Sequence, residues 1–452
     1  MRDVAPVSLA GTVSDLCAGR LDLHQHVDAL LDRIDGVDPA LLAVLPEPGR
    51  RARLHAEAAE LLARHPEPHG RPPLFGALVG VKDVLRVDGL PTLGGSSLPA
   101  GALAGSQAEV VGSLRAAGAM VLGKTRTAEF AYAAPGPTRN PHDLGHTPGG
   151  SSHGSAAGVA AGFFPLALGT QTIGSIVRPA AFCGVAGYVP TFGRVSADGS
   201  LQVSRSLDRI GLLAADVEGL ELAAQTLVAS WHPVRGTREP LLGVAGGPFL
   251  DAVEPAALDL FERQLEALAA AGYRVCRASL FEDAEQVAES LRRLMNGEFA
   301  REHAALFERY RDRYRAQTAA GIEHGMAVTD EQLAADRRAL VERRFEVESR
   351  RRAAGIDLWI TPAALGPAPP GVEASGSPWP NLPWSYLGLP AVAVPAGMLG
   401  GLPVGLQLVA GWHADEELLQ WAARLAGRVE FPAAPAAPAA PEASRRQSFS
   451  WY

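Results

Sequence analysis

Apolar residues recur at helical spacing over residues 13–34 and 50–64, which predicts two amphipathic helices near the start of the chain. Asp38-Pro39 and the Pro-Glu-Pro segment 66–68 are expected to end them. From 73 to 188 the pattern changes, because short apolar runs alternate with helical stretches; the helix-like 108–119, for example, leads into the apolar run 120–123. Such alternation predicts an α/β protein built on a layered sheet.

The second half of the chain contains a long polar interruption. Between about 282 and 354 the composition shifts to Glu, Arg, Ala and Leu at helical spacing, and glycine becomes rare. Apolar strand-like runs then return at 358–360, 391–395 and 404–410. We therefore expect the strands on both sides of the helical stretch to belong to one sheet.

Composition narrows the class of protein. The 452 residues are 47% hydrophobic, enough for a large core, and the net charge of −8 leaves no basic excess with which to bind nucleic acid. The three cysteines lie far apart at 17, 183 and 276 and suit a reducing compartment. The first residues lack a continuous apolar stretch, and the longest apolar run, 156–169, is too short to span a bilayer. These features favour a soluble cytoplasmic protein.

Metal and cofactor chemistry has little support in the sequence. His24 and His26 point to different sides of a predicted helix, while His142 and His146 lie in a loop rich in Gly and Pro. Neither pair has a third ligand at metal-binding spacing. We expect no metal and no cofactor.

The most informative chemistry lies in residues 147–188, where two serines follow glycines. Ser151 sits in Pro-Gly-Gly-Ser-Ser, and Ser175 follows Gly174, 24 residues later. Glycine allows backbone N–H groups to turn towards a bound atom. Two such turns around one packed segment indicate a binding site.

Lysine occurs only twice, at Lys82 and Lys124. A desolvated lysine can act as a base near neutral pH, whereas arginine stays protonated. Lys82 follows the strand-like run 74–79 in the segment Gly-Val-Lys-Asp. An apolar approach to a rare lysine makes Lys82 a candidate base.

These segments together resemble the amidase signature family. The resemblance rests on residues 80–83, 149–152 and 169–175, in the family's order and spacing. Further family landmarks are Lys124-Thr125 with 129–131, 190–196, 206–208, 357–362 and 401–407.

The resemblance implies a fold and its boundaries. It implies one α/β domain over residues 1–431, with a large mixed central sheet covered by helices on both faces. Within it we expect a helical N-terminal part over about 1–70 and a helix-rich variable part over about 282–354. Residues 432–452 are expected to form a separate Pro/Ala-rich tail.

The family's catalytic residues map onto this chain as a Ser–Ser–Lys triad. Ser175 would attack the amide carbonyl, and Lys82 would be the neutral base. Ser151, which in the family follows a cis peptide bond, would relay the proton between them. The backbone N–H groups of Thr172, Ile173, Gly174 and Ser175 would form the oxyanion hole. The resemblance thus implies an amidohydrolase acting on a small amide, with no nucleic acid or membrane partner. Whether the protein forms a homodimer stays open.

Substrate specificity is expected to depend on the position of one arginine, which differs by one residue from the family's usual pattern. The family commonly places arginine two residues after the nucleophile, but here Arg178 is three residues after it. Residues 169–181 resemble malonamidase-type members, in which the matching arginine holds the substrate's carboxylate. An acid-bearing amide such as malonamate is therefore expected, with Arg178, Gln171 and His153 as substrate-binding residues. The competing interpretation of Arg178 is a structural role.

Other interpretations of the same residues stay open at this stage. Gly-Ser-Ser-His-Gly, residues 150–154, matches the nucleophile elbow of α/β-hydrolases with Ser152 as nucleophile and His413 as a late histidine. The glycine-rich loops could instead bind phosphate, although no P-loop pattern is present. Finally, the chain could be the glutaminase-type subunit of a tRNA-dependent amidotransferase, which requires a partner subunit.

Overall fold

A single ten-stranded sheet organises the protein in its computed structural model, which describes residues 4, 6–99, 101–234 and 238–428. Its strand order is β2-β1-β3-β5-β4-β9-β10-β8-β6-β7. The strands are β1 (Leu78–Lys82), β2 (Met120–Thr125), β3 (Leu166–Gln171), β4 (Ala186–Val189), β5 (Arg209–Ala214), β6 (Leu241–Gly246), β7 (Arg274–Ser279), β8 (Leu358–Pro362), β9 (Ala391–Leu399) and β10 (Leu402–Ala410).

The sheet is mixed, as expected from the resemblance. β1 runs parallel to both of its neighbours, β2 and β3. At the opposite edge β6 runs parallel to β7 and β8. The strands between these two parallel blocks pair antiparallel. The strands before and after the long helical stretch therefore do belong to one sheet.

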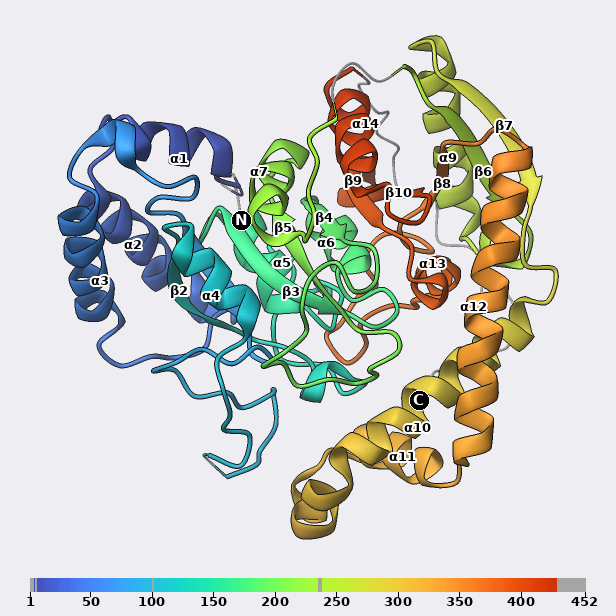
Figure 1. The fold of residues 1–452 in the computed structure, drawn as a ribbon, viewed down its shortest axis with the longest axis horizontal. Coiled ribbons are helices and arrows are strands. Elements are labelled where there is room, and N and C mark those ends of the chain that lie inside the picture. Colours follow the sequence, from blue (N-terminus) through green and yellow to red (C-terminus); the bar gives the residue numbers. More distant parts are fainter. Residues whose placement is uncertain (1–3, 5, 100, 235–237, 429–452) are drawn as a thin grey trace.

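Helices cover both faces of the sheet (Figure 1). The α-helices of the described residues are α1 (Leu9–Cys17), α2 (Leu23–Leu41), α3 (Arg50–Arg64), α4 (Glu109–Ala116), α5 (His153–Ala160), α6 (Val177–Cys183), α7 (Val217–Leu227), α8 (Pro248–Asp251), α9 (Pro255–Ala270), α10 (Ala284–Tyr310), α11 (Ala316–Met326), α12 (Asp330–Ala353), α13 (Leu382–Leu387) and α14 (Asp415–Arg428). Helices α5 and α6 pack together against the central strands, and α7 packs with α14 against them as a second pair. The buried apolar side chains form one main cluster that includes residues from α1 through α14.

The start of the chain differs from the expected pattern in two ways. The predicted helix 13–34 is two helices, because Asp22 caps α2 by accepting a hydrogen bond from the N–H of Gln25. The expected break at Asp38-Pro39 is wrong, since α2 continues through Pro39 to Leu41. The carboxylate of Asp38 accepts hydrogen bonds from the N–H groups of Ala43 and Val44, which holds the chain just after the helix.

The helix-rich part consists of α10, α11 and α12, which pack together and extend beyond the sheet (Figure 1). Among the described residues, no helix is both long and apolar enough to cross a bilayer. The boundary expected at 431 and the Pro/Ala-rich segment 432–452 lie outside the described residues. The single-domain boundaries stay a prediction.

Candidate active site

The ends of three parallel strands assemble the site. β1 ends at Lys82, β2 at Thr125 and β3 at Gln171. Because these strands are parallel and adjacent, their carboxyl ends meet at one edge of the sheet. This edge brings Lys82 next to the chain that leads into Ser175.

Lys82 is completely buried, and the groups of the described residues that lie at hydrogen-bond distance from it are neutral. Its Nζ lies 2.8 Å from the Oγ of Ser151, 2.8 Å from the Oγ1 of Thr170 and 3.2 Å from the carbonyl oxygen of Thr170. Burial lowers the pKa of Lys82 well below its ordinary value, and the charge of Asp208 opposes this shift only in part. Burial thus favours the neutral amine form of Lys82.

The other lysine has a different environment. The Nζ of Lys124 pairs with the carboxylate of Asp83 at 2.8 Å and also donates to Thr92 at 2.9 Å. Although Asp83 follows Lys82 directly in sequence, its carboxylate is committed to Lys124. The two lysines therefore divide into an ion-paired cation and an amine bonded to hydroxyl and carbonyl groups.

The two candidate serines lie on adjacent loops. The peptide bond between Gly150 and Ser151 is cis, in agreement with the expectation from the family. The N–H of Ser152 donates to the carbonyl of Ser175 at 3.3 Å, which ties the two loops together. Within the described residues no hydrogen bond joins the hydroxyls of Ser151 and Ser175. Catalytic hydrogen bonds are often long without substrate, so this does not argue against a relay.

Backbone donors lie beside Ser175. The N–H groups of Ile173, Gly174 and Ser175 have no acceptor within the described part of the chain. Gly174 is needed for this turn, because a Cβ on it would lie 2.2 Å from the Oδ1 of Asn381. The side-chain amide of Asn381 is in turn held by the Oε1 of Gln407 at 3.1 Å.

A small pocket opens beside Ser175. Its cavity volume of about 20 Å³ leaves room for about one water molecule. Its walls are mostly apolar and include Met295 of α10, so the helix-rich part contributes to it. The lining residues are Ala131, Tyr132, Thr172, Ile173, Gly174, Ser175, Arg178, Val203, Met295 and Pro378.

Arg178 lines this pocket but also supports the loops around it. It is 3% exposed, and its guanidinium donates to the carbonyls of Gly150 and Ser375, both at 2.7 Å. Gly150 belongs to the cis peptide, so Arg178 helps to hold the loop of Ser151. The structure therefore gives Arg178 a supporting role and places it within reach of the pocket.

Gln171 lies elsewhere than expected. Its Oε1 accepts hydrogen bonds from the N–H groups of Ile176 and Val177 at 2.8 and 3.1 Å, and its Nε2 donates to Ser385 at 3.1 Å. These bonds satisfy the free N–H groups at the start of α6. Gln171 is 1% exposed and is not among the pocket residues, so it positions the helix that follows the nucleophile.

His153 also lies away from the pocket. It is 2% exposed, its Nδ1 is 2.9 Å from the hydroxyl of Thr138, and its ring fills the space above Gly136. The Thr138 hydroxyl donates to the carbonyl of Leu42 at 2.6 Å, so Nδ1 carries the proton. Burial lowers the pKa of His153 to about 3, which keeps the ring neutral. Packing explains its presence better than substrate binding.

The α/β-hydrolase alternative does not fit this geometry. Among the described residues no strand directly precedes Ser152; a loop leads into it and α5 follows. The hydroxyl of Ser152 donates to the carbonyl of Thr170 at 3.1 Å, while His413 lies beyond β10 and its N–H donates to Thr191. Ser152 therefore supports β3.

Several residues of the site were not singled out from the sequence. Thr170 and Asp208 lie inside the segments 169–175 and 206–208, which carry the family resemblance. The resemblance did not indicate what these two side chains do. Gln407 likewise lies in the landmark 401–407. Asn381 had no local signal, because its place behind Gly174 depends on a contact 207 positions away in the chain.

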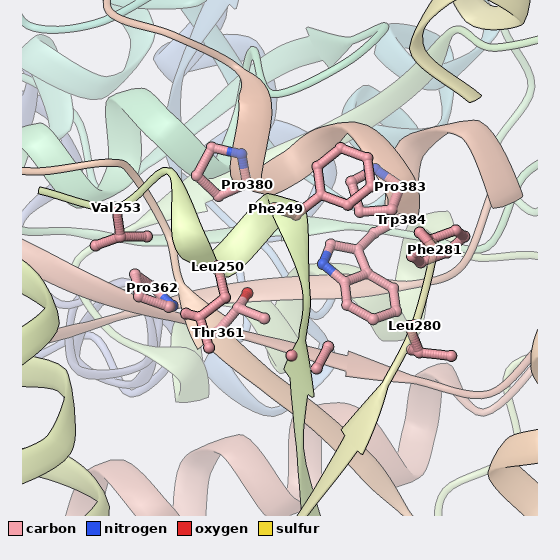
Figure 2. A pocket seen from close by; sticks show the side chains of 12 residues that line it. Phe249, Leu250, Val253, Leu280, Phe281, Thr361, Pro362, Pro380, Pro383 and Trp384 are labelled. Atoms are coloured by element: carbon pink, nitrogen blue, oxygen red, sulfur yellow. The ribbon is translucent and has the colours of Figure 1, made fainter. Parts of the chain in front are cut away.

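A second pocket lies at the carboxyl ends of β6, β7 and β8, and Figure 2 shows its apolar side chains, among them Phe249, Leu250 and Trp384. Its cavity volume of about 10 Å³ is at the lower limit for one water molecule. None of the predicted site residues lines it. Within the described residues, no cluster of three or more His, Cys, Asp or Glu side chains is arranged to hold a metal ion.

Comparisons with known proteins agree with the geometry. A family model described as Amidase matches residues 25–419. One relative, a glutamyl-tRNA(Gln) amidotransferase subunit from Chloroflexus aggregans, is 30% identical over 93% of this chain and 95% of its own length. The corresponding subunit from Thermus thermophilus is 33% identical over 89% and 93%.

Solved structures give a similar result. A crystal structure described as an amidase superposes with a TM-score of 0.84 at 32% identity, covering 94% of this chain and 100% of that one. A peptide amidase in complex with the competitive inhibitor chymostatin has a TM-score of 0.82 at 27% identity, covering 94% and 98%.

Proposed function

Because this chain belongs to the amidase family, we propose that it cleaves the C–N bond of a small carboxylic amide through an acyl-enzyme on Ser175. The observation that carries the proposal is the buried amine of Lys82, 2.8 Å from the hydroxyl of Ser151 and without a carboxylate partner at hydrogen-bond distance among the described residues. A buried lysine without an ion-pair partner is costly to keep unless its basicity is used.

The proposed reaction moves one proton along two serines. The hydroxyl proton of Ser175 passes to Ser151 while the proton of Ser151 passes to the Nζ of Lys82. The Oγ of Ser175 bonds to the amide carbon, the C–N bond breaks, and the relay returns the proton to the leaving nitrogen. Water then adds to the acyl group by the same route and releases the carboxylic acid.

The backbone donors would stabilise the charge that develops on the carbonyl oxygen. The N–H groups of Ile173, Gly174 and Ser175 point to this role because they lack acceptors within the described residues. Thr172 is the fourth expected donor. Removal of one such donor typically costs about 10²–10³-fold in kcat.

For the substrate, we propose a short amide that carries an acid group, such as malonamate. Arg178 supports this proposal because it lines the same pocket as Ser175, and a guanidinium suits a carboxylate.

A second candidate is the glutaminase-type subunit of a tRNA-dependent amidotransferase. The two curated relatives described above belong to glutamyl-tRNA(Gln) amidotransferases, and they favour this candidate over malonamate. Glutamine also carries a carboxylate, so Arg178 could serve either substrate. Under this candidate the chain works together with a partner protein.

Ammonia release from the purified chain separates these candidates. Malonamate, glutamine and propionamide would be assayed with wild type and with Ser175→Ala. Release from malonamate by the chain alone supports a free-standing amidase. Release only from glutamine, increased by amidotransferase partner subunits, supports the second candidate. If no amide yields ammonia, with or without partners, while the protein is folded, the proposed function is wrong.

A further inference from the structure

Asp208 is a half-buried carboxylate to which the proposed mechanism gives no role. It directly precedes β5, whose antiparallel pairing with β3 sets Arg209 opposite Gln171. Its Oδ1 accepts a hydrogen bond from the Oγ1 of Thr172 at 2.6 Å, and its Oδ2 accepts one from the N–H of Val203 at 2.6 Å. Thr172 and Val203 both line the pocket that contains Ser175. One carboxylate therefore joins two walls of this pocket.

The same carboxylate interacts with the candidate base. The charges of Asp208 and Lys82 act on each other; Lys82 is buried and Asp208 is half-buried. The charge of Asp208 also acts on Arg209, but the guanidinium of Arg209 donates to the carbonyls of Pro190 and Leu389. Burial raises the pKa of Asp208 to about 6, against the hydrogen bonds and Lys82, which lower it. The group is a carboxylate at neutral pH and loses its charge in mild acid.

We propose that Asp208 is a positioning residue of the hydrolytic site: it fixes Thr172 and Val203 beside Ser175, and it is the counter-charge for the ammonium that the relay creates on Lys82. This inference rests on the proposed function, since no ammonium forms without the relay. A buried cation is strongly disfavoured unless a negative charge lies near it. Asp208 supplies that charge from a fixed position, so no reorganisation is needed when the proton arrives.

The pH dependence of Ser175 reactivity tests the proposal without knowledge of the substrate. The probe is a fluorophosphonate, and its second-order rate of inactivation would be measured from pH 4.5 to 9. In wild type we expect the rate to fall in acid through an ionisation near pH 6. In Asp208→Asn we expect a fall of about tenfold or more at pH 8 and a move of the acid limb to lower pH. The limb moves because the carboxyl no longer titrates and the ammonium of Lys82 loses its stabilising charge.

Thr172→Val gives an independent test that keeps the carboxylate. Loss of the hydroxyl removes a hydrogen bond that lowers the pKa of Asp208, so the acid limb should move to higher pH. Thr172→Ser restores the donor and should return the limb towards the wild-type position. As a matched control, Asp216→Asn replaces a carboxylate just beyond the other end of β5, where it caps α7. This control should leave the profile unchanged.

The outcomes separate this inference from the proposed function. If the fluorophosphonate does not react with Ser175 in wild type, the proposed function fails. If Ser175 reacts but folded Asp208→Asn keeps the wild-type rate and limb, only the inference about Asp208 is wrong. Should Asp208→Asn not fold, an unmoved acid limb in Thr172→Val overturns the inference in its place.

Discussion

The Nζ of Lys82 lies 2.8 Å from the Oγ of Ser151, although 69 positions separate the two residues in the chain. Lys82 is the last residue of β1, and Ser151 lies in the loop that leads through Ser152 into α5. Both side chains are buried. In this arrangement the hydroxyl proton of a serine can pass directly to an amine.

Replacement of Lys82 should abolish turnover while the protein stays folded. Lys82→Ala is expected to lower kcat for ammonia release by at least about 10³-fold, because the relay loses its base. Lys82→Arg should be equally poor, since a guanidinium stays protonated. Lys124→Arg, which keeps the charge of its ion pair with Asp83, should retain activity. An arginine variant at 82 with more than about a tenth of wild-type activity would rule out general-base catalysis by this residue.

Arg178 should set the preference for acid-bearing amides. The quantity to measure is the ratio of kcat/KM for malonamate to that for propionamide. Arg178→Ala should lower this ratio by about 10–100-fold, because charge-assisted hydrogen bonds of this kind contribute about 1.5–3 kcal/mol.

Arg178 also holds the loops of Gly150 and Ser375, so its loss should lower kcat/KM for both amides. The ratio of the two values removes this shared effect. Arg277→Ala, a surface change on β7, is the control and should leave the ratio unchanged. An acid preference that survives the loss of Arg178, or its absence in wild type, would contradict the role of this residue.

His153 should affect stability rather than specificity. His153→Ala removes the hydrogen bond to Thr138 and leaves a gap beside Gly136, and we expect a loss of about 1–3 kcal/mol at pH 7. The ratio of kcat/KM for malonamate to that for propionamide should not change. A changed ratio of the two kcat/KM values without a loss of stability would show that His153 contributes to substrate binding.

The pH dependence of this loss has a definite sign. The folded pKa of His153, about 3, is lowered from 6.5, so below pH 6.5 the unfolded chain binds a proton that the folded site does not. Wild type is therefore destabilised through His153 as pH falls from 6.5 towards 3, and the alanine variant is not. The difference in free energy of unfolding between the two proteins, from denaturant titrations, should be smaller at pH 5 than at pH 7. A larger difference at pH 5 would contradict this sign.

The sequence indicated the mixed sheet, which the structure confirms, and it marked the residues of the candidate triad, which stays a prediction, more directly than the roles of the surrounding polar residues. Lys82, Ser151 and Ser175 lie in short glycine-containing motifs whose backbone requirements are local, so the motifs mark them directly. Gln171 was expected to bind substrate, but a carboxamide serves equally well as a cap, and only the three-dimensional position of α6 decides between these roles.

Long-range contacts account for most of what the sequence left open. Asp208 acts on Lys82 and Thr172 because β5 pairs with β3 and β3 with β1, an order that local periodicity does not specify. The error at Pro39 has a different cause: proline removes the N–H that would bond to the carbonyl of Asp35, yet α2 continues for two more residues, and the Asp38 carboxylate binds the N–H of Ala43 just after it.

The identity of the nucleophile tests the account most directly. After reaction with a fluorophosphonate, no Arg or Lys separates Ser152 from Ser175, so the labelled tryptic peptide must be fragmented to place the added mass. We expect the mass on Ser175, its loss in Ser175→Ala and its retention in Ser152→Ala. A label on Ser152, or a label that persists in Ser175→Ala, would contradict the proposed acyl-enzyme.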